Sequence, residues 1–220
     1  MLRHSNNRLP MEDPLRLIPR GLTKLYSTWV SLTFPFASVG QHLSVHYTCE
    51  LKRVVSRQIK IGNSVCIGKD AWLNVAYPWG EPKIVIDDKA LIGPHCQISA
   101  KNCIHIERDA LISASVLIQD HIHAYEDTTL SITEQSVTEG GRVRIGQGCW
   151  IGRGAAIVCT KGELVLGRNC VVGANAVVLR SFPPYSVIFG NPAIVIRRYD
   201  VTQKKWVPGS GRLADPELVR

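Results

Sequence analysis

A six-residue repeat of aliphatic residues constrains this sequence more than any other feature. Ile or another aliphatic residue recurs at every sixth position, often followed by Gly, and the fifth position of each unit is small. The units come in pairs that begin with IGNSVC at Ile61, IDDKAL at Ile86, IERDAL at Ile106, IGQGCW at Ile145 and LGRNCV at Leu166. A third, weaker unit follows each pair. This period excludes an α-helix and predicts short parallel strands joined by corners.

Three units of six residues form one triangular coil, so the sequence predicts about five coils. Successive coil starts are always more than 18 residues apart, and the extra residues always follow the third unit. We therefore expect every insertion at one corner of a prism. The predicted fold is all-β, a parallel β-helix over residues 59–198. Cys96, Cys149 and Cys170 occupy small fifth positions, which indicates core residues rather than ligands or nucleophiles.

We assign no coil of the prism to the segments before and after the repeat. Residues 1–58 form an N-terminal extension whose basic, proline-punctuated start is expected to be loose or wrapped on a neighbour. Residues 199–220 form a polar tail, with one strand expected around Trp206. Apolar residues at helical spacing predict a short amphipathic helix before Pro35. These residues are Leu22, Leu25, Tyr26, Trp29 and Val30. We interpret the helix as a cap on the open end of the prism, with a helix on a membrane surface as the alternative.

Charge and cysteine usage narrow the possible partners and the compartment. The net charge of +8 suits an anionic partner such as nucleic acid, a membrane surface, a phosphorylated cofactor or an acidic sugar. The chain has no known nucleic-acid motif and no basic run interleaved with aromatic residues, which argues against nucleic acid. Seven cysteines without a CxxC motif indicate reduced thiols, and the N-terminus lacks a signal-peptide core. We expect a cytoplasmic protein, with the inner face of the membrane as an option.

Three stretches extend the repeat into a family pattern. They read ISAKNCIHIERDALISASVLIQDHIHAYED, IGQGCWIGRGAAIV and VVGANAVVLRSFPPYSVIFGNPAIVIRRYD. With these stretches the chain resembles the hexapeptide-repeat acyltransferases, and most of all the bacterial O-acetyltransferases of polysaccharide and lipopolysaccharide synthesis. The resemblance implies a left-handed β-helix, a homotrimer, and acetyl-CoA bound in the groove between adjacent prisms. It also implies a sugar or glycan hydroxyl as the acetyl acceptor.

The long insertion over residues 119–142 is the predicted catalytic loop. Acetyl transfer to a hydroxyl needs a base with a pKa near neutrality, and histidine is the usual choice. The resemblance places that base at the sixth position counted from Ile118, which is His123, and leaves His121 as the alternative. Glu126 and Asp127 are candidates for orienting the base or binding sugar hydroxyls, with solvated loop charges as the alternative.

The resemblance also assigns contacts outside the loop. Trp150 would lie against acceptor or cofactor, unless it is simply a packing aromatic. Ser99 stands where some relatives carry an acceptor-binding Asn, so acceptor preferences of xenobiotic and galactoside enzymes transfer poorly. The remaining assignments concern acetyl-CoA and rest on Arg153 and Ala174 for the pantetheine, Arg180 for the phosphates, and Gly190, Asn191, Arg197 and Arg198 in the closing stretch.

Two alternatives to glycan acetylation stay open at this point. The first is an acetyltransferase for a small sugar or xenobiotic. The second is a trimeric zinc protein of the γ-carbonic-anhydrase type, which would need three histidines converging on the metal. An HxH pair is present at His121 and His123, whereas a His-x4-His spacing is not. We therefore expect no metal.

Overall fold

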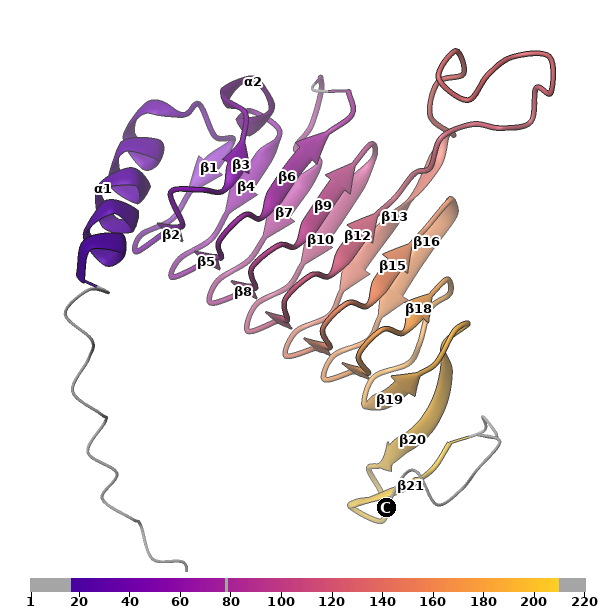
Figure 1. Ribbon diagram of the computed structural model, residues 1–220. Coiled ribbons are helices and arrows are strands. Elements are labelled where there is room, and N and C mark those ends of the chain that lie inside the picture. The colour runs from indigo at the N-terminus through magenta and orange to yellow at the C-terminus, as the bar shows by residue number, and fades with distance from the viewer. Residues whose placement is uncertain (1–16, 78, 210–220) are drawn as a thin grey trace, which may run out of the picture.

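Three parallel sheets form the walls of a triangular prism (Figure 1). The computed structural model describes residues 17–77 and 79–209; the start of the N-terminal extension and the last part of the predicted tail lie outside them. Sheet A contains β1 (Ser38–Val39), β4 (Ile59–Ile61), β7 (Ile84–Ile86), β10 (Cys103–Ile106), β13 (Gly140–Ile145) and β16 (Lys161–Leu166). Sheet B begins with β2 (Ser44–Val45), β5 (Cys66–Ile67), β8 (Leu91–Ile92), β11 (Leu111–Ile112), β14 (Trp150–Ile151) and β17 (Val171–Val172). Sheet C contains β3 (Glu50–Leu51), β6 (Trp72–Val75), β9 (Gln97–Ala100), β12 (Leu117–Gln119), β15 (Ala156–Val158) and β18 (Val177–Val178).

The strand register confirms the repeat read from the sequence. In sheet A, Ile61 pairs with Ile86, Ile86 with Ile106, Ile106 with Ile145, and Ile145 with Leu166. The second and third units stack in the same way in sheets B and C. The fold is therefore the predicted left-handed parallel β-helix. Every insertion leaves the prism at one corner, between sheets C and A, as the spacing of the units requires.

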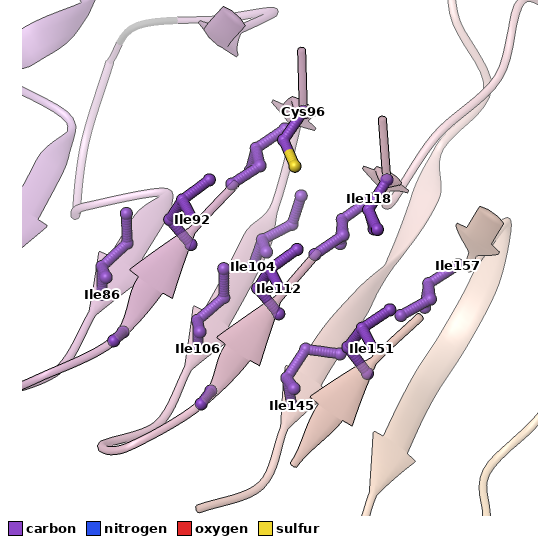
Figure 2. Packing of buried hydrophobic residues seen from close by; sticks show 14 of the residues in the cluster. Ile86, Ile92, Cys96, Ile104, Ile106, Ile112, Ile118, Ile145, Ile151 and Ile157 are labelled. Atoms are coloured by element: carbon purple, nitrogen blue, oxygen red, sulfur yellow. The ribbon is translucent and has the colours of Figure 1, made fainter. Parts of the chain in front are cut away.

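Stacked aliphatic side chains fill the interior of the prism. Figure 2 shows isoleucines of successive coils lying above one another, among them Ile86, Ile106 and Ile145. The small fifth positions are also buried, including Cys96, Cys149 and Cys170. A larger side chain there would meet the opposite wall of the narrow core, which explains why Ala, Cys and Val occupy these positions. The three cysteines are free and lie in the core, as expected.

The structure has about six coils where the repeat predicted five. The additional coil comprises β1, β2 and β3, in residues that the sequence assigned to the N-terminal extension. Its fifth positions are Leu43 and Cys49, and both are buried. Leu43 is larger than the Ala, Cys or Val found at other fifth positions, and His46 stands where Gly often follows the aliphatic residue. The coil therefore keeps the period but carries an unusual residue at one fifth position and at one second position.

The tight corners depend on close stacking between coils. A Cβ on Gly152 would lie 2.6 Å from the backbone nitrogen of Ala174 in the next coil, so only glycine fits there. The left-handed backbone that closes each corner falls two residues later. Asn175 has φ of 57° at this place, and Asp70, His95 and Ser115 have similar values in their coils. Non-glycine residues thus accept positive φ at equivalent corner positions in several coils.

Helices and antiparallel strands cover the two ends of the prism. Helix α1 (Leu17–Thr33) packs on the first coil through buried Val30 and Ser27, whose hydroxyl accepts a hydrogen bond from the backbone nitrogen of Val45. The short helix α2 (Arg53–Ser56) follows β3. At the other end, sheet B continues through β19 (Ser186–Phe189) into antiparallel β20 (Ile194–Asp200) and β21 (Lys205–Pro208). Strand β21 contains Trp206, as predicted. Within the described residues, no helix combines the length and apolar character needed to cross a bilayer.

Candidate active site

The longest insertion projects from the corner between sheets C and A (Figure 1). It runs from the end of β12 at Gln119 to the start of β13 at Gly140, so the last three residues of the predicted loop belong to β13. Two of its segments pair near the prism, where the backbone nitrogen of Thr138 donates to the carbonyl of Ile122 at 2.8 Å. The base of the loop is therefore held in a defined conformation next to the prism.

A buried aspartate and histidine lie at the start of this loop. Asp120 is fully buried, and its Oδ1 lies 2.9 Å from Nδ1 of His121, which is also buried. Oδ1 also accepts a hydrogen bond from the backbone nitrogen of Lys101, and Oδ2 accepts from the backbone nitrogens of Asn102 and Cys103. A carboxylate that already accepts three backbone N–H groups is an acceptor toward the imidazole as well, so we assign the proton of His121 to Nδ1. Nε2 is left with the lone pair that a general base requires.

Asp120 was not among the residues singled out in the sequence. The signal that could have found it is the Asp-His dipeptide directly after the strand of the third unit, because the chain turns there and brings adjacent side chains together. The backbone nitrogens of residues 101–103 come from the same corner of the preceding coil. Stacking of coils thus places three donors where Asp120 can accept them, which sequence spacing alone does not reveal.

The other predicted loop residues lie in more exposed positions. His123 is exposed, and its backbone forms an isolated antiparallel bridge with Val137. Glu126 accepts a hydrogen bond from the backbone nitrogen of Tyr125. Asp127 accepts from the backbone nitrogen and hydroxyl of Thr129, and these hydrogen bonds lower the pKa of the Asp127 carboxyl. Both carboxylates therefore stabilise turns of the loop, whereas Asp120 is the carboxylate that contacts His121.

Polar side chains line sheet C next to the buried histidine. Asn74, Ser99 and Gln119 are in register on three successive coils, and the amide nitrogen of Asn74 donates to the Ser99 hydroxyl at 3.3 Å. Gln119 directly precedes Asp120 in the chain. The predicted site residue Ser99 therefore belongs to a polar column that leads along the outer face of sheet C toward the base of the loop.

Two contacts fasten the loop to the preceding coils. The ammonium group of Lys101 donates to the carbonyl oxygen of Thr138 at 2.6 Å and lies 5.6 Å from the centre of the Tyr77 ring. The hydroxyl of Tyr77 lies 2.7 Å from the hydroxyl of Ser136. Both contacts hold the returning segment of the loop, so they fix the wall that faces the start of the loop at His121.

Trp150 lies on a different wall of the prism. It is half exposed on β14 in sheet B, and its indole nitrogen donates to the Ser113 hydroxyl at 3.0 Å. Leu91 and Leu111 precede it in the same outward-facing column and are also exposed. Sheet B is the wall opposite the corner between sheets C and A. A single chain therefore does not bring Trp150 next to His121.

The predicted cofactor contacts fall into two groups. Arg153 and Ala174 lie at the corner between sheets B and C on adjacent coils, where the carbonyl of Arg153 accepts from the backbone nitrogen of Asn175 at 2.9 Å. Both side chains are exposed. This corner is the other edge of sheet C, across that sheet from His121.

The second group lies at the C-terminal end of the prism. Arg180 and Arg198 line one cavity of about 460 Å³, together with Phe182, Ser186 and Pro208 among others. The Arg180 guanidinium stacks on the Phe182 ring, 5.2 Å from its centre. Arg197 neighbours Arg198 on β20.

The closing stretch around Gly190 and Ala193 forms backbone hydrogen bonds with β18, the last strand of sheet C. The carbonyl of Gly190 accepts a hydrogen bond from the backbone nitrogen of Val177, and the backbone nitrogen of Ala193 donates to the Val177 carbonyl. Asn191 lies exposed in the turn between these two contacts.

Across residues 17–77 and 79–209, no three His, Cys, Asp or Glu side chains converge on a position that could hold a metal ion.

Comparisons with known proteins place this geometry in a family, although no protein-family model matches the chain. The chain is 31% identical to the putative lipopolysaccharide biosynthesis O-acetyl transferase WbbJ of Escherichia coli over 134 residues, which is 58% of this chain and 67% of WbbJ. It is also 31% identical to the putative colanic acid biosynthesis acetyltransferase WcaF of Escherichia coli over 140 residues, 63% of this chain and 68% of WcaF. Among solved structures, the N-acyltransferase AntD of Bacillus cereus, in complex with dTDP and 3-hydroxybutyryl-CoA, matches with a TM-score of 0.64 at 20% identity. That match covers 85% of this chain and 90% of AntD and shows a shared fold. The repeat, its register and these relatives together show that the chain belongs to the bacterial hexapeptide-repeat acetyltransferases.

Proposed function

We propose that the protein transfers the acetyl group of acetyl-CoA to a hydroxyl of a sugar in a surface polysaccharide or its precursor. The observation that carries this proposal is the buried Asp120–His121 pair at the base of the long loop, next to the polar column of sheet C. The names of WbbJ and WcaF support a glycan acceptor, and the name of WbbJ supports oxygen as the acetylated atom. The cytoplasmic location expected from the sequence fits a donor that is a cellular cofactor.

The chemistry at the histidine follows from its hydrogen bond. Asp120 holds the proton on Nδ1, so Nε2 accepts the proton of the acceptor hydroxyl as its oxygen attacks the thioester carbonyl. The tetrahedral intermediate then collapses, the C–S bond breaks, and the histidine returns the proton to the leaving CoA thiolate. Asp120 stabilises the imidazolium that exists between these two transfers and keeps the ring in the productive tautomer.

The geometry favours His121 as the base over His123, which the count from Ile118 selected. His121 has a carboxylate partner on Nδ1, whereas His123 is exposed and its backbone bridges the two arms of the loop. An oriented imidazole is the better base because its tautomer and direction are fixed before the acceptor arrives. We assign His123, with Glu126 and Asp127 farther along the loop, to the mouth of the acceptor site, and Ser99 to its wall.

Acetyl-CoA would extend from His121 across sheet C toward the edge that carries Arg153 and Ala174. Its phosphates would be bound at the C-terminal end, where Arg180 and Arg198 line a common cavity and Arg197 lies beside them. Guanidinium groups suit this role because their charge is permanent and their paired donors match phosphate oxygens. The turn at Gly190 and Asn191 borders the same end of the prism.

A homotrimer would complete the site. Trp150 and His121 lie on opposite sides of one prism, so both could act at one site only if neighbouring protomers meet there. The exposed column of Leu91, Leu111 and Trp150 offers an apolar surface that a second copy would cover. Light scattering should give about three times the chain mass of 24.3 kDa. A monomer at micromolar concentration would contradict this arrangement.

The nature of the acceptor atom is testable from the product. The protein is incubated with radiolabelled acetyl-CoA and a surface-glycan extract, and the labelled product is then treated with mild alkali. We expect the label to be released, because an acetyl ester is labile to alkali whereas an acetyl amide is stable. Label that survives the treatment would instead identify an amino sugar as the acceptor. Metal analysis of the same preparation tests the alternative that the protein is a zinc enzyme of the γ-carbonic-anhydrase type. We expect the purified protein to contain no stoichiometric zinc.

A further inference from the structure

The long loop returns to the prism directly beside the point where it leaves. The backbone nitrogen of Gly141, on the returning strand β13, donates a hydrogen bond to the carbonyl oxygen of Asp120 at 2.7 Å. This carbonyl belongs to the peptide bond that joins Asp120 to His121. A movement of the returning strand would therefore turn that peptide and, with it, the two side chains of the buried pair.

Gly140, the residue before this contact, passes so close to the pair that no side chain fits there. A Cβ on Gly140 would lie 2.5 Å from the carbonyl oxygen of Asp120 and 3.2 Å from the Cβ of His121. The φ of Gly140 is 74°, in the left-handed region that glycine adopts readily. Because the clash involves backbone, it could be relieved only by moving the Asp120–His121 peptide or the returning strand.

The returning strand has no room to withdraw, because the next coil confines it. A Cβ on Gly141 would collide with Sγ of Cys159, which is buried. Gly141 is also in register with Gly162 on β16, the neighbouring strand of sheet A. The two glycines are thus confined on both sides, so a side chain at position 140 would displace the start of the loop.

Asn102, at the same corner of the preceding coil, holds both ends of the loop. Its backbone nitrogen donates to Oδ2 of Asp120 at 2.7 Å. Its side-chain amide donates to the carbonyl of Glu139, the residue before Gly140, at 2.8 Å. Asn102 therefore fixes the carboxylate that orients His121 and also the strand that packs against the peptide of the pair.

We infer that Asn102 and Gly140 are positioning residues for the Asp120–His121 pair. They act on the base through its peptide and its carboxylate partner and not through the substrates. The inference rests on the proposed function, in which His121 must be aligned with the acceptor hydroxyl. A displacement on the order of 1 Å can lower a rate by about 10²-fold, so the close packing at Gly140 bears on turnover as well as on the turn.

Gly140→Ala tests this inference, with Gly162→Ala as the matched control. Gly162 also has a positive φ, of 67°, but a Cβ there would meet no atom within 4 Å. Both variants therefore carry backbone strain, and only Gly140→Ala displaces the pair. With acetyl-CoA and one accepted sugar, Gly140→Ala should lower kcat roughly 10- to 100-fold and leave KM for acetyl-CoA nearly unchanged. Gly162→Ala should keep kcat within about twofold of the natural value.

Asn102→Ala provides a milder variant that decides the inference if Gly140→Ala does not fold. It removes the amide contact to the Glu139 carbonyl and keeps the backbone donor to Asp120. We expect kcat to fall by roughly threefold to tenfold, the factor that one neutral hydrogen bond is worth. Asn63→Ala is its control, because this asparagine contacts Asp88 at a different corner and should leave kcat unchanged.

The hydrogen bond between His121 and Asp120 provides a readout that does not require acetyl transfer. The ring proton on Nδ1 lies against a carboxylate oxygen 2.9 Å from the nitrogen, so it should give a far-downfield NMR signal in histidine-labelled protein. Loss of the signal in His121→Ala assigns it. We expect the signal in the natural chain and in Gly162→Ala, and a shifted or missing signal in Gly140→Ala and Asn102→Ala.

The two readouts separate this inference from the proposed function. A natural chain without the signal, or an unchanged signal and near-natural kcat in Gly140→Ala, would overturn the inference and leave acetyl transfer intact. An equal fall in kcat for Gly162→Ala would also overturn it, because backbone strain alone would then explain the loss. If the natural chain transfers no acetyl group, the proposed function fails, and the NMR comparison alone decides whether Asn102 and Gly140 position the pair.

Discussion

Asp120→Asn removes the charge that holds His121 in its productive tautomer while changing the volume very little. The asparagine can place its amide nitrogen where Oδ1 now accepts from Nδ1 of His121 and from the backbone nitrogen of Lys101. The amide nitrogen is a donor, so Nδ1 must then become an acceptor and the proton must move to Nε2. In the flipped orientation the histidine keeps its tautomer, but the amide nitrogen meets the backbone nitrogens of Asn102 and Cys103.

The first orientation loses the hydrogen bond from Lys101, and the flipped orientation loses those from Asn102 and Cys103. Each hydrogen bond to a charged acceptor is worth about 1.5–3 kcal/mol, so we expect the unfolding free energy to fall by about 1.5–6 kcal/mol. That loss is a large share of the about 5–15 kcal/mol that stabilises a typical protein, so kinetics must be measured well below the melting temperature. Under these conditions we expect kcat to fall by about 10²–10⁴. The histidine is then either in the wrong tautomer or without the carboxylate that stabilises its protonated form.

Steady-state kinetics with acetyl-CoA and one accepted sugar measures this effect, and denaturant unfolding measures the stability change. Acetyl-CoA affinity should stay nearly constant, because Asp120 acts on the histidine and not on the nucleotide. Asp88→Asn is the matched control, since this carboxylate accepts a hydrogen bond from the backbone nitrogen of Asn63 at the corner between sheets A and B and should leave kcat close to the natural value. If Asp120→Asn keeps kcat within about threefold of the natural protein, general-base catalysis by an oriented His121 is refuted.

Three further predictions concern the cofactor, the loop and the core. Arg180→Glu should weaken binding of acetyl-CoA more than binding of dephospho-CoA in calorimetric titrations, because the contact is with phosphate charge; equal effects on both ligands would show that Arg180 is a surface charge only. Lys101→Met removes the contact to the Thr138 carbonyl and should raise KM for the acceptor several-fold with a smaller effect on KM for acetyl-CoA, whereas equal changes in both would argue against a role in the acceptor wall. Cys149→Leu overfills a fifth position and should lower unfolding free energy by about 1–3 kcal/mol in denaturant titrations, while Cys66→Leu on the outer face of sheet B should cost far less.

The fold was predictable because the six-residue period of the coils appears directly as a period of aliphatic and small residues in the sequence. Each coil must bury an aliphatic residue and a small residue on every wall, so Ile61, Ile86 and Ile106 mark the register directly. The constant phase of the insertions also located the corner that carries the loop. The first coil escaped prediction because Leu43 replaces the usual small residue and His46 the usual glycine, although the period continues through both.

The candidate site was predictable as a region and less so as a set of contacts. Composition and spacing located the long loop and its two histidines. The role of Asp120 depends on backbone nitrogens of residues 101–103 in the preceding coil, which donate hydrogen bonds to its carboxylate. Such contacts depend on how coils stack and are not encoded by a local motif. The separation of Trp150 from His121 is likewise a property of the three-walled prism, because sequence distance does not say which wall faces which corner.

Kinetics of the two single variants His121→Ala and His123→Ala test the central claim most directly. Each purified variant is first shown to bind acetyl-CoA and is then assayed for alkali-labile acetylation of one accepted sugar. We predict that His121→Ala lowers kcat by about 10²–10⁴ and that His123→Ala changes mainly KM for the acceptor. A His123→Ala variant that is inactive beside a His121→Ala variant with near-natural turnover would contradict the assignment, and full activity in both would contradict a histidine base altogether.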